Sequence, residues 1–253
     1  MSVSLEKLLQ TLDEWLQPHT ISDYCPNGLQ VEGRGSVRRL VTGVTASQAL
    51  LDAAVEAGAD AILVHHGYFW KGEDPAVRGM KKRRLATLLK QDISLIAYHL
   101  PLDLHPELGN NVQLAAQLGV SIEGGLEPDN PRSIGLWGRL PQPLSPAELA
   151  ARLEQVLGRA PQWIDGGPAR IERLGWCTGA AQGYIDKAAE LGLDAYLSGE
   201  ISEPTVHSAR ECGVHYFAAG HHASERFGVQ AVGERLAAEL GLEHRFIDID
   251  NPV

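Results

Sequence analysis

Short apolar segments alternate with helical segments along most of this chain, and this alternation restricts its fold more than any other feature. The clearest strand is predicted over residues 61–64, between helices predicted over 47–57 and 80–90. The joints are short, and Gly58 is well placed to end the first of these helices. The pattern predicts an α/β fold with mainly parallel sheets and right-handed crossovers.

The same alternation continues on both sides of a segment rich in Gly, Pro and Asp, residues 124–134. Further helices are predicted over 4–16, 106–118, 145–157, 182–191, 203–212 and 223–240, and strands over 40–44, 93–97, 134–140, 174–177, 195–198, 214–218 and 244–249. Residues 22–33 are predicted to be a loop. We therefore expect two domains, residues 1–125 and 126–253, with the C-terminal elements free to pack back on the first.

The two halves carry similar segments. Residues 51–61 resemble residues 185–195 after a shift of 134 residues, and Thr42-Gly43 resembles Thr178-Gly179 if the second half is two residues shorter at that turn. This similarity predicts two related βαβ units. Chance similarity is the alternative, because short Gly-x-Asp-Ala segments are common in such folds.

Two adjacent histidines, His65 and His66, end the apolar run of residues 61–64. Binding sites of open α/β sheets form outside the carboxyl ends of the strands. Neutral imidazole is a common ligand of zinc, iron, copper and nickel. A single histidine at a strand end is more often structural, and a metal site needs about three or four protein ligands, so other segments must contribute.

Two further strand ends supply such residues. Asp103 follows the strand predicted over 93–97, and His221 and Glu225 follow the strand predicted over 214–218. His221 and Glu225 are four residues apart, which places them on one face if a helix starts there. Taken alone, that pair would more often be an exposed surface pair.

Five nitrogen and oxygen ligands suit two ions better than one. Adjacent side chains diverge on an extended backbone, so His65 and His66 are expected to serve different ions. A carboxylate such as Glu225 can bridge two ions about 3.5–4 Å apart, an arrangement that activates water for hydrolysis. The absence of thiolate donors favours zinc, iron, manganese, cobalt or nickel.

Other residues near the predicted strand ends are weaker candidates. His99 could orient Asp103 or a bound water, and Glu200 could be a general base or a solvated surface carboxylate. Residues 68–71 (Tyr-Phe-Trp-Lys) could form a wall for a nucleobase or simply pack. The basic run of residues 81–84 could contact phosphate or a partner, although such runs are usually solvated. His105 and His222 are also weaker candidates, and His222 is expected to be structural.

Composition and missing motifs exclude several classes of function. The formal net charge of −10 argues against broad binding to nucleic acid or acidic membranes. Three widely spaced cysteines give no disulfide framework and favour a reducing cytoplasm. Residues 1–17 are predicted to form an amphipathic helix, not a signal peptide, and no apolar stretch approaches the roughly 20 residues of a membrane span. Nucleotide-binding P-loop, Rossmann and serine-hydrolase motifs are absent.

Several segments together resemble the GTP cyclohydrolase I type 2 homologue family, also described as NGG-interacting-factor-like. The resemblance covers nearly the whole chain and is carried by Ile21-Ser22-Asp23-Tyr24, Pro26–Gly33, Thr42–Ser47, His65–Gly72 and Gly220–Arg226. It implies two interlocked α/β domains, a dinuclear metal site between them, and a toroidal homohexamer. Matched residue by residue, it implies the ligands His65, His66, Asp103, His221 and Glu225.

The chain departs from the family in two respects. Ser224 stands where many members have Thr, and the chain is too short for the domain that longer members insert between the halves. We expect a dinuclear metal-dependent hydrolase of a small nucleotide-like or heterocyclic substrate, similar to a cyclohydrolase or amidohydrolase. The alternative is a non-enzymatic metal-binding scaffold or regulatory protein. A metal that only stabilises the assembly is the third reading, and structural sites are usually closed.

Overall fold

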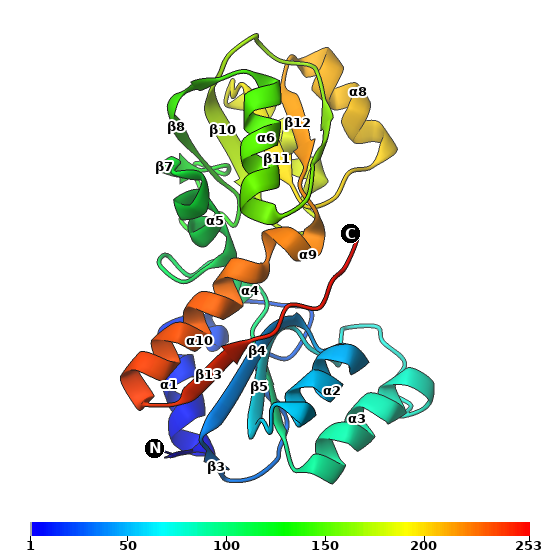
Figure 1. The fold of residues 1–253 in the computed structure, drawn as a ribbon. Helices are drawn as coiled ribbons and strands as arrows, with labels where there is room; N and C mark the ends of the chain where they lie inside the picture. The colour runs from blue at the N-terminus through cyan, green and yellow to red at the C-terminus, as the bar shows by residue number, and fades with distance from the viewer. Residues whose placement is uncertain (1) are drawn as a thin grey trace. The chain divides into compact units, whose positions relative to one another are not determined.

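The computed structural model describes residues 2–253, which form two compact α/β units. The first unit contains the chain up to Leu108 together with Gly228–Asp250, and the second contains Gly109–Phe227 together with Asn251–Val253. The chain thus leaves the first unit once and returns to it near the C-terminus (Figure 1). The expected boundary at residue 125 falls at the end of a strand of the second unit.

The first unit is built on a five-stranded sheet in the order β13-β4-β5-β6-β2. Its strands are β13 (Glu243–Phe246), β4 (Arg39–Thr45), β5 (Ala61–His66), β6 (Ser94–Ala97) and β2 (Gly28–Val31). All neighbours in this sheet are parallel except β2, which pairs antiparallel with β6. The short strands β1 (Val3–Ser4) and β3 (Ser36–Val37) form a separate antiparallel pair.

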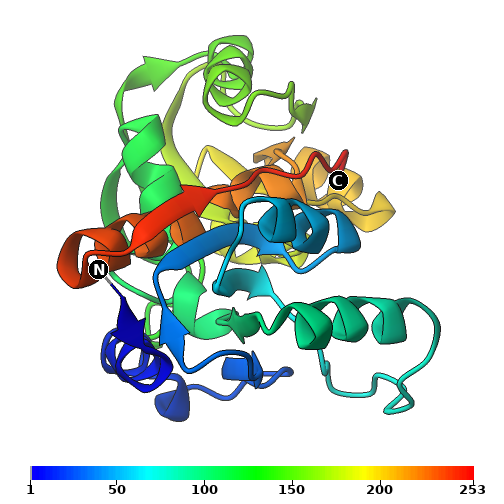
Figure 2. The same cartoon turned by 60° about the horizontal axis from the view of Figure 1, so that its bottom comes forward.

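Helices cover both faces of this sheet, as Figures 1 and 2 show. They are α1 (Leu5–Leu16), the 3-10 turn η1 (Pro18–Thr20), α2 (Gln48–Glu56), α3 (Gly79–Gln91), α4 (Leu100–Asp103) and, from Gly228 onward, α10 (Arg226–Leu240). Leu63 packs with α1 and α10, whereas Ile62 packs with α2 and α3. The apolar run at residues 61–64 is continuous because successive side chains enter cores on opposite faces.

The second unit is built on a six-stranded sheet in the order β7-β8-β10-β11-β12-β9. Its strands are β7 (Ser121–Gly125), β8 (Leu136–Leu144), β10 (Ile171–Cys177), β11 (Ala195–Ser198), β12 (His215–Ala218) and β9 (Gln162–Ile164). The three central strands β10, β11 and β12 are parallel, and the outer strands pair antiparallel. The mainly parallel arrangement therefore holds at the centre of this sheet and not at its edges.

Helices again cover both faces of the second sheet. They are α5 (Asn110–Leu118), α6 (Pro146–Leu157), the 3-10 turn η2 (Gln182–Tyr184), α7 (Ile185–Glu190), α8 (Glu203–Cys212) and the short α9 (His221–Ser224). Leu197 packs with α5 and α6, and Tyr196 packs with α7 and α8. The side chain of Ser145 caps α6 in a capping box with Glu148, as the sequence pattern indicates.

The strand registers establish how the two units correspond. Leu40 of β4 is paired with Ala61 of β5, and Leu174 of β10 is paired with Ala195 of β11, so one shift of 134 residues relates both strands. The predicted relation between the halves is confirmed for these strands. The proposed match of Thr42-Gly43 with Thr178-Gly179 is wrong, because the same register places Gly179 opposite Thr45.

Several local expectations differ from the structure. The loop predicted over residues 22–33 contains β2, whose short length and surrounding turn residues concealed it. Cys25 and Cys177 are buried as expected, but Cys212 is exposed at the end of α8. All three cysteines are free. Among residues 2–253, no helix combines the length and apolar character needed to cross a membrane.

Candidate metal centre

His65 and His66 lie at the carboxyl end of β5, in the middle of the first sheet. The His65 side chain is fully buried, and its Nδ1 lies 3.0 Å from the carbonyl oxygen of Tyr98. A carbonyl can only accept, so Nδ1 carries the hydrogen and Nε2 keeps the lone pair of the neutral ring. A backbone contact from the adjacent strand end therefore selects the nitrogen that His65 presents to a ligand.

His66 is fixed from the other side of β5. It is the register partner of Thr45 in β4, and the Thr45 hydroxyl lies 3.1 Å from His66 Nδ1. The centroids of the two imidazole rings are 4.6 Å apart, so the side chains do not diverge as expected for an extended strand. The strand ends at His66, and both rings therefore reach past the edge of the sheet.

His99 joins these two residues from the end of β6. Its ring centroid lies 5.0 Å from that of His65 and 5.7 Å from that of His66. One nitrogen of each ring lies within 4.8 Å of one nitrogen of each of the others. We call these residues, His65, His66 and His99, the first-unit histidine cluster. The sequence singled out His99 only as an orienting residue, so its place in the cluster is a finding of the structure.

Asp23 holds His99 in place. Its Oδ1 accepts from His99 Nδ1 at 2.8 Å, and its carboxylate also accepts from Asn27 Nδ2 and from the backbone N–H of Leu100. Burial alone would raise the pKa of Asp23, but the hydrogen bonds from His99 and Asn27 outweigh it and lower the pKa to about 2. Asp23 is thus a charged orienting partner. Sequence reasoning missed this role, although Asp23 lies within a segment that carries the family resemblance.

Asp103 ends α4, the short helix that follows His99. Its side chain is buried, and Oδ2 lies 3.6 Å from Nε2 of His65. The α4 turn is closed by a bond from the backbone N–H of Asp103 to the His99 carbonyl. The first unit therefore brings a carboxylate beside the predicted ligand His65.

The second unit carries a corresponding pair after β12. His221 Nε2 lies 3.2 Å from Oε2 of Glu225, and His221 Nδ1 lies 2.7 Å from Oε1 of Glu200. Burial lowers the pKa of His221, but hydrogen bonds to Glu225 and Glu200 outweigh it and raise the pKa to about 9. The four-residue spacing places His221 and Glu225 together as predicted. Glu200 is an orienting partner of His221, and a catalytic role for Glu200 stays a prediction.

Two glycines make room for this pair. A Cβ at Gly179 would lie 2.3 Å from Oε1 of Glu225, and Gly179 has a φ of +71°, which favours glycine. A Cβ at Gly199 would lie 2.6 Å from the Cα of His221. The backbone thus approaches both acidic and imidazole groups at the ends of β10 and β11. The sequence analysis did not assign these glycines a role in the site.

The remaining candidates are placed by structural contacts. His105 Nδ1 accepts from the backbone N–H groups of Glu107 and Leu108, and burial lowers the pKa of His105. His222 is buried, and its backbone N–H donates to the Val253 carbonyl. These contacts describe His105 and His222 as structural residues.

The aromatic run after His66 divides into packing and exposed residues. The Tyr68 hydroxyl donates to the buried Ala46 carbonyl, so Tyr68 belongs to the core. Phe69 is 38 % exposed, and Lys81 lies over its ring. The Trp70 ring meets His99 edge-on at 5.0 Å and lies 6.0 Å from His66. Trp70 is the member of the run that borders the first-unit histidine cluster.

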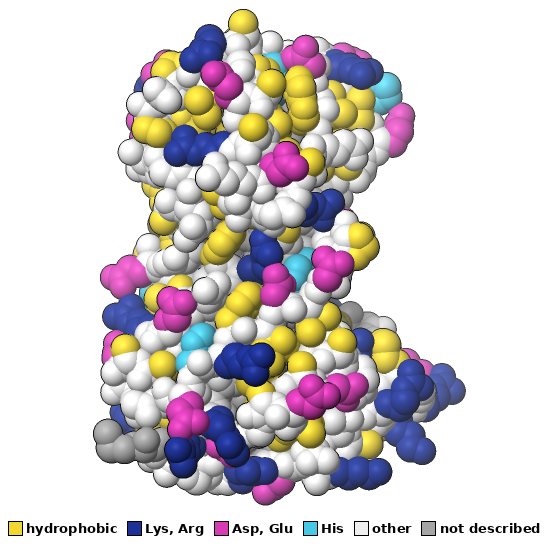
Figure 3. Space-filling view, viewed as in Figure 1, with side chains coloured by type: hydrophobic (Ala, Val, Ile, Leu, Met, Phe, Trp, Pro, Cys, Tyr) yellow, Lys and Arg dark blue, Asp and Glu magenta, His cyan; other side chains and the backbone are white. Residues whose placement is uncertain are grey.

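Basic side chains gather on α3, at the lower right of Figure 3. Residues 75–91 contain six Lys or Arg residues and no Asp or Glu, although the whole chain carries a net charge of −10. Arg78 at the start of this segment pairs with Asp74, and Lys81 pairs with Glu73. These contacts fit a solvated face that is partly neutralised by the preceding loop.

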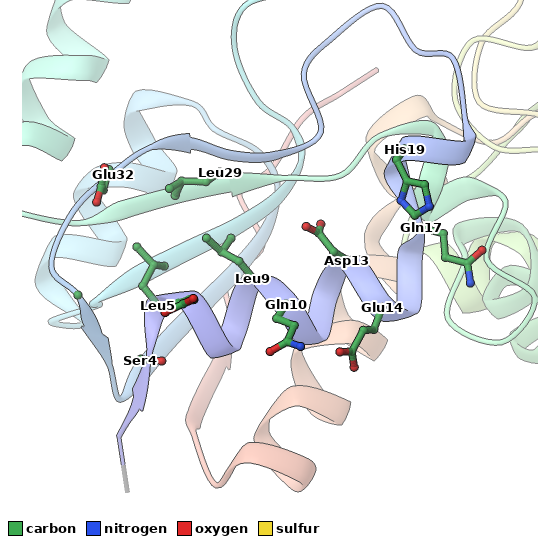
Figure 4. A pocket seen from close by; sticks show the side chains of 12 residues that line it. Ser4, Leu5, Leu9, Gln10, Asp13, Glu14, Gln17, His19, Leu29 and Glu32 are labelled. Atoms are coloured by element: carbon green, nitrogen blue, oxygen red, sulfur yellow. The ribbon is translucent and has the colours of Figure 1, made fainter.

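A separate pocket lies beside α1 in the first unit. Its volume is about 1100 Å³, and its lining includes Leu5, Leu9, Asp13, Leu29 and Glu32. Figure 4 shows Leu5, Leu9 and Asp13 pointing from α1 toward the strand that carries Leu29. The residues that line this pocket include none of the predicted metal ligands, so we do not assign the predicted chemistry to it.

Comparisons with known proteins agree on one family. The family model Duf34/NIF3 (NGG1p interacting factor 3) matches residues 3–252. A Pseudomonas aeruginosa protein named GTP cyclohydrolase 1 type 2 homolog is 64 % identical over 252 residues, covering 100 % of both chains. An Escherichia coli K12 protein of the same name is 57 % identical over 247 residues, covering 97 % of this chain and 98 % of its own.

Solved structures of similar chains have the same fold. A protein described as "ybgI, unknown function" superposes with a TM-score of 0.95 at 55 % identity, covering 99 % of this chain and 100 % of its own. A Thermus thermophilus protein superposes with a TM-score of 0.89 at 33 % identity, with the same coverage of both chains. The architecture described above is therefore shared over the full length of these relatives.

Proposed function

Because this chain belongs to the Duf34/NIF3 family, we propose that it binds two divalent metal ions and uses them to hydrolyse a small nucleotide-like or heterocyclic substrate. The observation that carries the proposal is the orientation of four histidines. His65, His66, His99 and His221 each have Nδ1 beside an oxygen of the protein, from Tyr98, Thr45, Asp23 and Glu200 respectively. Metal-ligating histidines are typically held in this way.

The donor set fits divalent transition metals. The proposed ligands are those implied by the family resemblance: His65, His66 and Asp103 in the first unit, and His221 and Glu225 in the second. Imidazole and carboxylate donors without thiolate suit zinc, iron, manganese, cobalt or nickel. A buried carboxylate such as Glu225, which is 3 % exposed, is costly without a positive partner, and this cost further supports cation binding.

The protein residues would have separate tasks at such a centre. Divalent ions, when bound, supply Lewis-acid polarisation of a substrate bond. Asp23 and Glu200 keep His99 and His221 in fixed orientations. Trp70, beside His66 and His99, would provide one wall for a flat substrate ring. The relatives' name, GTP cyclohydrolase 1 type 2 homolog, is the reason to include purine nucleotides among the candidate substrates.

The first experiment is a metal count per chain on protein purified without a metal-chelating tag. We expect about two ions in the wild type and a sharp fall in Glu225→Ala, because a bridging carboxylate serves both ions. Glu211→Ala is the matched control, since Glu211 is exposed at the end of α8. Absence of bound metal after reconstitution with zinc, manganese or iron would overturn the metal-binding proposal.

A second experiment tests hydrolysis. The metal-loaded protein is incubated with GTP and other nucleotides, and consumption is followed by chromatography. We expect turnover that disappears with a chelator and in Asp103→Ala. Metal-loaded protein that consumes no substrate across the nucleotide set, but binds a specific protein partner, would support the alternative of a metal-binding regulatory scaffold.

The proposed assembly is a toroidal homohexamer, as the family resemblance implies. Light scattering coupled to size-exclusion chromatography measures the mass directly. A mass of about six chains supports the hexamer, and a mass of one or two chains contradicts it. Comparing metal-free with metal-loaded protein also tests whether the metal only stabilises the assembly.

A further inference from the structure

We propose that the first-unit histidine cluster is a metal site in its own right, which binds one divalent ion through His65, His66 and His99 without any residue of the second unit. This inference rests on the proposed metal binding but goes beyond it. It makes His99 a ligand in the state that carries one ion. All three residues, and the oxygens that orient them, belong to the first unit.

The first argument is the nitrogen that each ring presents. Asp23 accepts from Nδ1 of His99, and the Tyr98 carbonyl accepts from Nδ1 of His65. In their neutral forms both rings therefore keep the lone pair on Nε2, which is the form that binds a metal. Nδ1 of His66 is likewise occupied, by the Thr45 hydroxyl.

The second argument is convergence. One nitrogen of each ring lies within 4.8 Å of a nitrogen of each of the other two. Two imidazole nitrogens on the same zinc ion, each about 2.0–2.1 Å from it, can be at most about 4.2 Å apart. The rings therefore need only a small rotation to share an ion, and Asp103, with Oδ2 3.6 Å from His65 Nε2, can supply a fourth ligand.

The third argument is that the cluster is already ordered. His65 is fully buried, and the side chain of His99 is 12 % exposed. Asp23, which fixes His99, is 3 % exposed and accepts hydrogen bonds from Asn27 and the Leu100 backbone as well. Fixing three imidazoles in advance reduces the entropy lost when the ion binds.

The second unit offers a weaker set. His221 supplies one imidazole, and its two carboxylate neighbours are Glu225 and Glu200. Glu200 already accepts from His221 Nδ1, which leaves one imidazole and one carboxylate to face an ion. Two protein ligands are too few for a closed transition-metal site, so the first unit is expected to fill first.

The test uses the full-length protein with the second-unit ligands removed. In His221→Ala/Glu225→Ala, we expect one ion per chain by elemental analysis, and an X-ray absorption spectrum of the cobalt form that shows three imidazole ligands. If this variant does not fold, His221→Asn/Glu225→Gln preserves side-chain volume and carries the same measurement. Wild-type protein with two ions beside a variant with none would overturn the inference and leave the proposed function intact.

His99 is then tested on the same background. His99→Ala should lower cobalt affinity by more than about a hundredfold, because loss of an orienting partner alone costs about ten- to a hundredfold. Asp23→Asn should fall in that smaller range, and His19→Ala, an exposed histidine of the first unit, should change nothing. An effect of His99→Ala no larger than that of Asp23→Asn would overturn its role as a ligand. Wild-type protein without metal would overturn both proposals.

Discussion

The two units share a frame and differ in the donors attached to it. In each, three parallel strands stand in the order of their sequence, and the third is followed by a four-residue helix. In the first unit a histidine and a carboxylate four residues apart, His99 and Asp103, flank this helix as His221 and Glu225 do in the second. The comparison teaches that the strand ends fix positions, whereas the residues placed there fix the chemistry.

The register makes the substitutions explicit. With the shift of 134 residues, His65 corresponds to Gly199, His66 to Glu200 and Thr45 to Gly179. The first unit therefore gathers imidazoles where the second has open backbone and a carboxylate. In the first unit Thr45 orients a histidine, and in the second the missing side chain of Gly179 admits Glu225.

The largest expected effect tests whether the shared frame is energetically equivalent in both units. Leu63 and Leu197 occupy corresponding positions and are 2 % and 0 % exposed. Replacing either with Ala should lower the free energy of unfolding by between about 2 and 5 kcal/mol, as buried Leu→Ala changes do. Urea denaturation of both variants measures this. Losses that differ by more than the range itself would show that the frames are packed unequally.

The next effect concerns the glycine that distinguishes the second unit. Gly179→Ala places a Cβ against Glu225 and adds the cost of a positive φ, so we expect a loss of about 3 kcal/mol together with reduced metal content. Gly158→Ala is the matched control, because Gly158 has a φ of +70° and a Cβ there meets nothing within 4 Å. The control should lose only about 1 kcal/mol. Equal losses would show that space for Glu225 is not the reason for Gly179.

Most of the frame could be predicted from the sequence. The helices and central strands have strong apolar patterns, and the run at residues 61–64 is continuous because both faces of the sheet are covered. The edge strands β2, β7 and β9 were missed, because short antiparallel edges have too few residues for a clear alternation. The direction of the edge strands depends on tertiary pairing, which no local pattern encodes.

The predicted ligands could be found because each follows a strand, and strand ends meet at one edge of a parallel sheet. Their partners could not. Asp23 lies 76 residues from His99 in the sequence, and Thr45 lies 21 residues from His66. Such contacts depend on register and on loop conformation, so only the folded chain shows which oxygen orients which imidazole.

A smaller effect compares the carboxylates that orient the histidines. The folded-state pKa of Asp23 is lowered to about 2, so its charge stabilises the fold above its unfolded pKa and loses this effect as the pH falls through about 2. Asp23→Asn should therefore cost about 2 kcal/mol at neutral pH in metal-free protein, and roughly half as much near pH 3. Denaturation midpoints at the two pH values measure the difference. A pH-independent cost would mean that shape, not charge, is what Asp23 contributes.

Glu200→Gln provides the counterpart in the second unit. The Glu200 side chain is 33 % exposed, against 3 % for Asp23, so water screens its interaction with His221 more strongly. We expect its replacement to cost less stability than Asp23→Asn. A larger cost in the second unit would reverse the comparison and make Glu200 the stronger of the two orienting carboxylates.

The smallest effect isolates the orientation of a single imidazole. Thr45→Ala removes the hydroxyl beside Nδ1 of His66 but leaves both strands and all proposed ligands in place. Loss of such an orienting partner should weaken metal binding by about tenfold, equivalent to about 1.4 kcal/mol, with little change in unfolding free energy. Cobalt titration against wild type measures it, and Thr45→Ser should restore the affinity because the hydroxyl returns. An unrescued loss would mean that the Thr45 methyl group, which packs at the end of the sheet, matters more than its hydrogen bond.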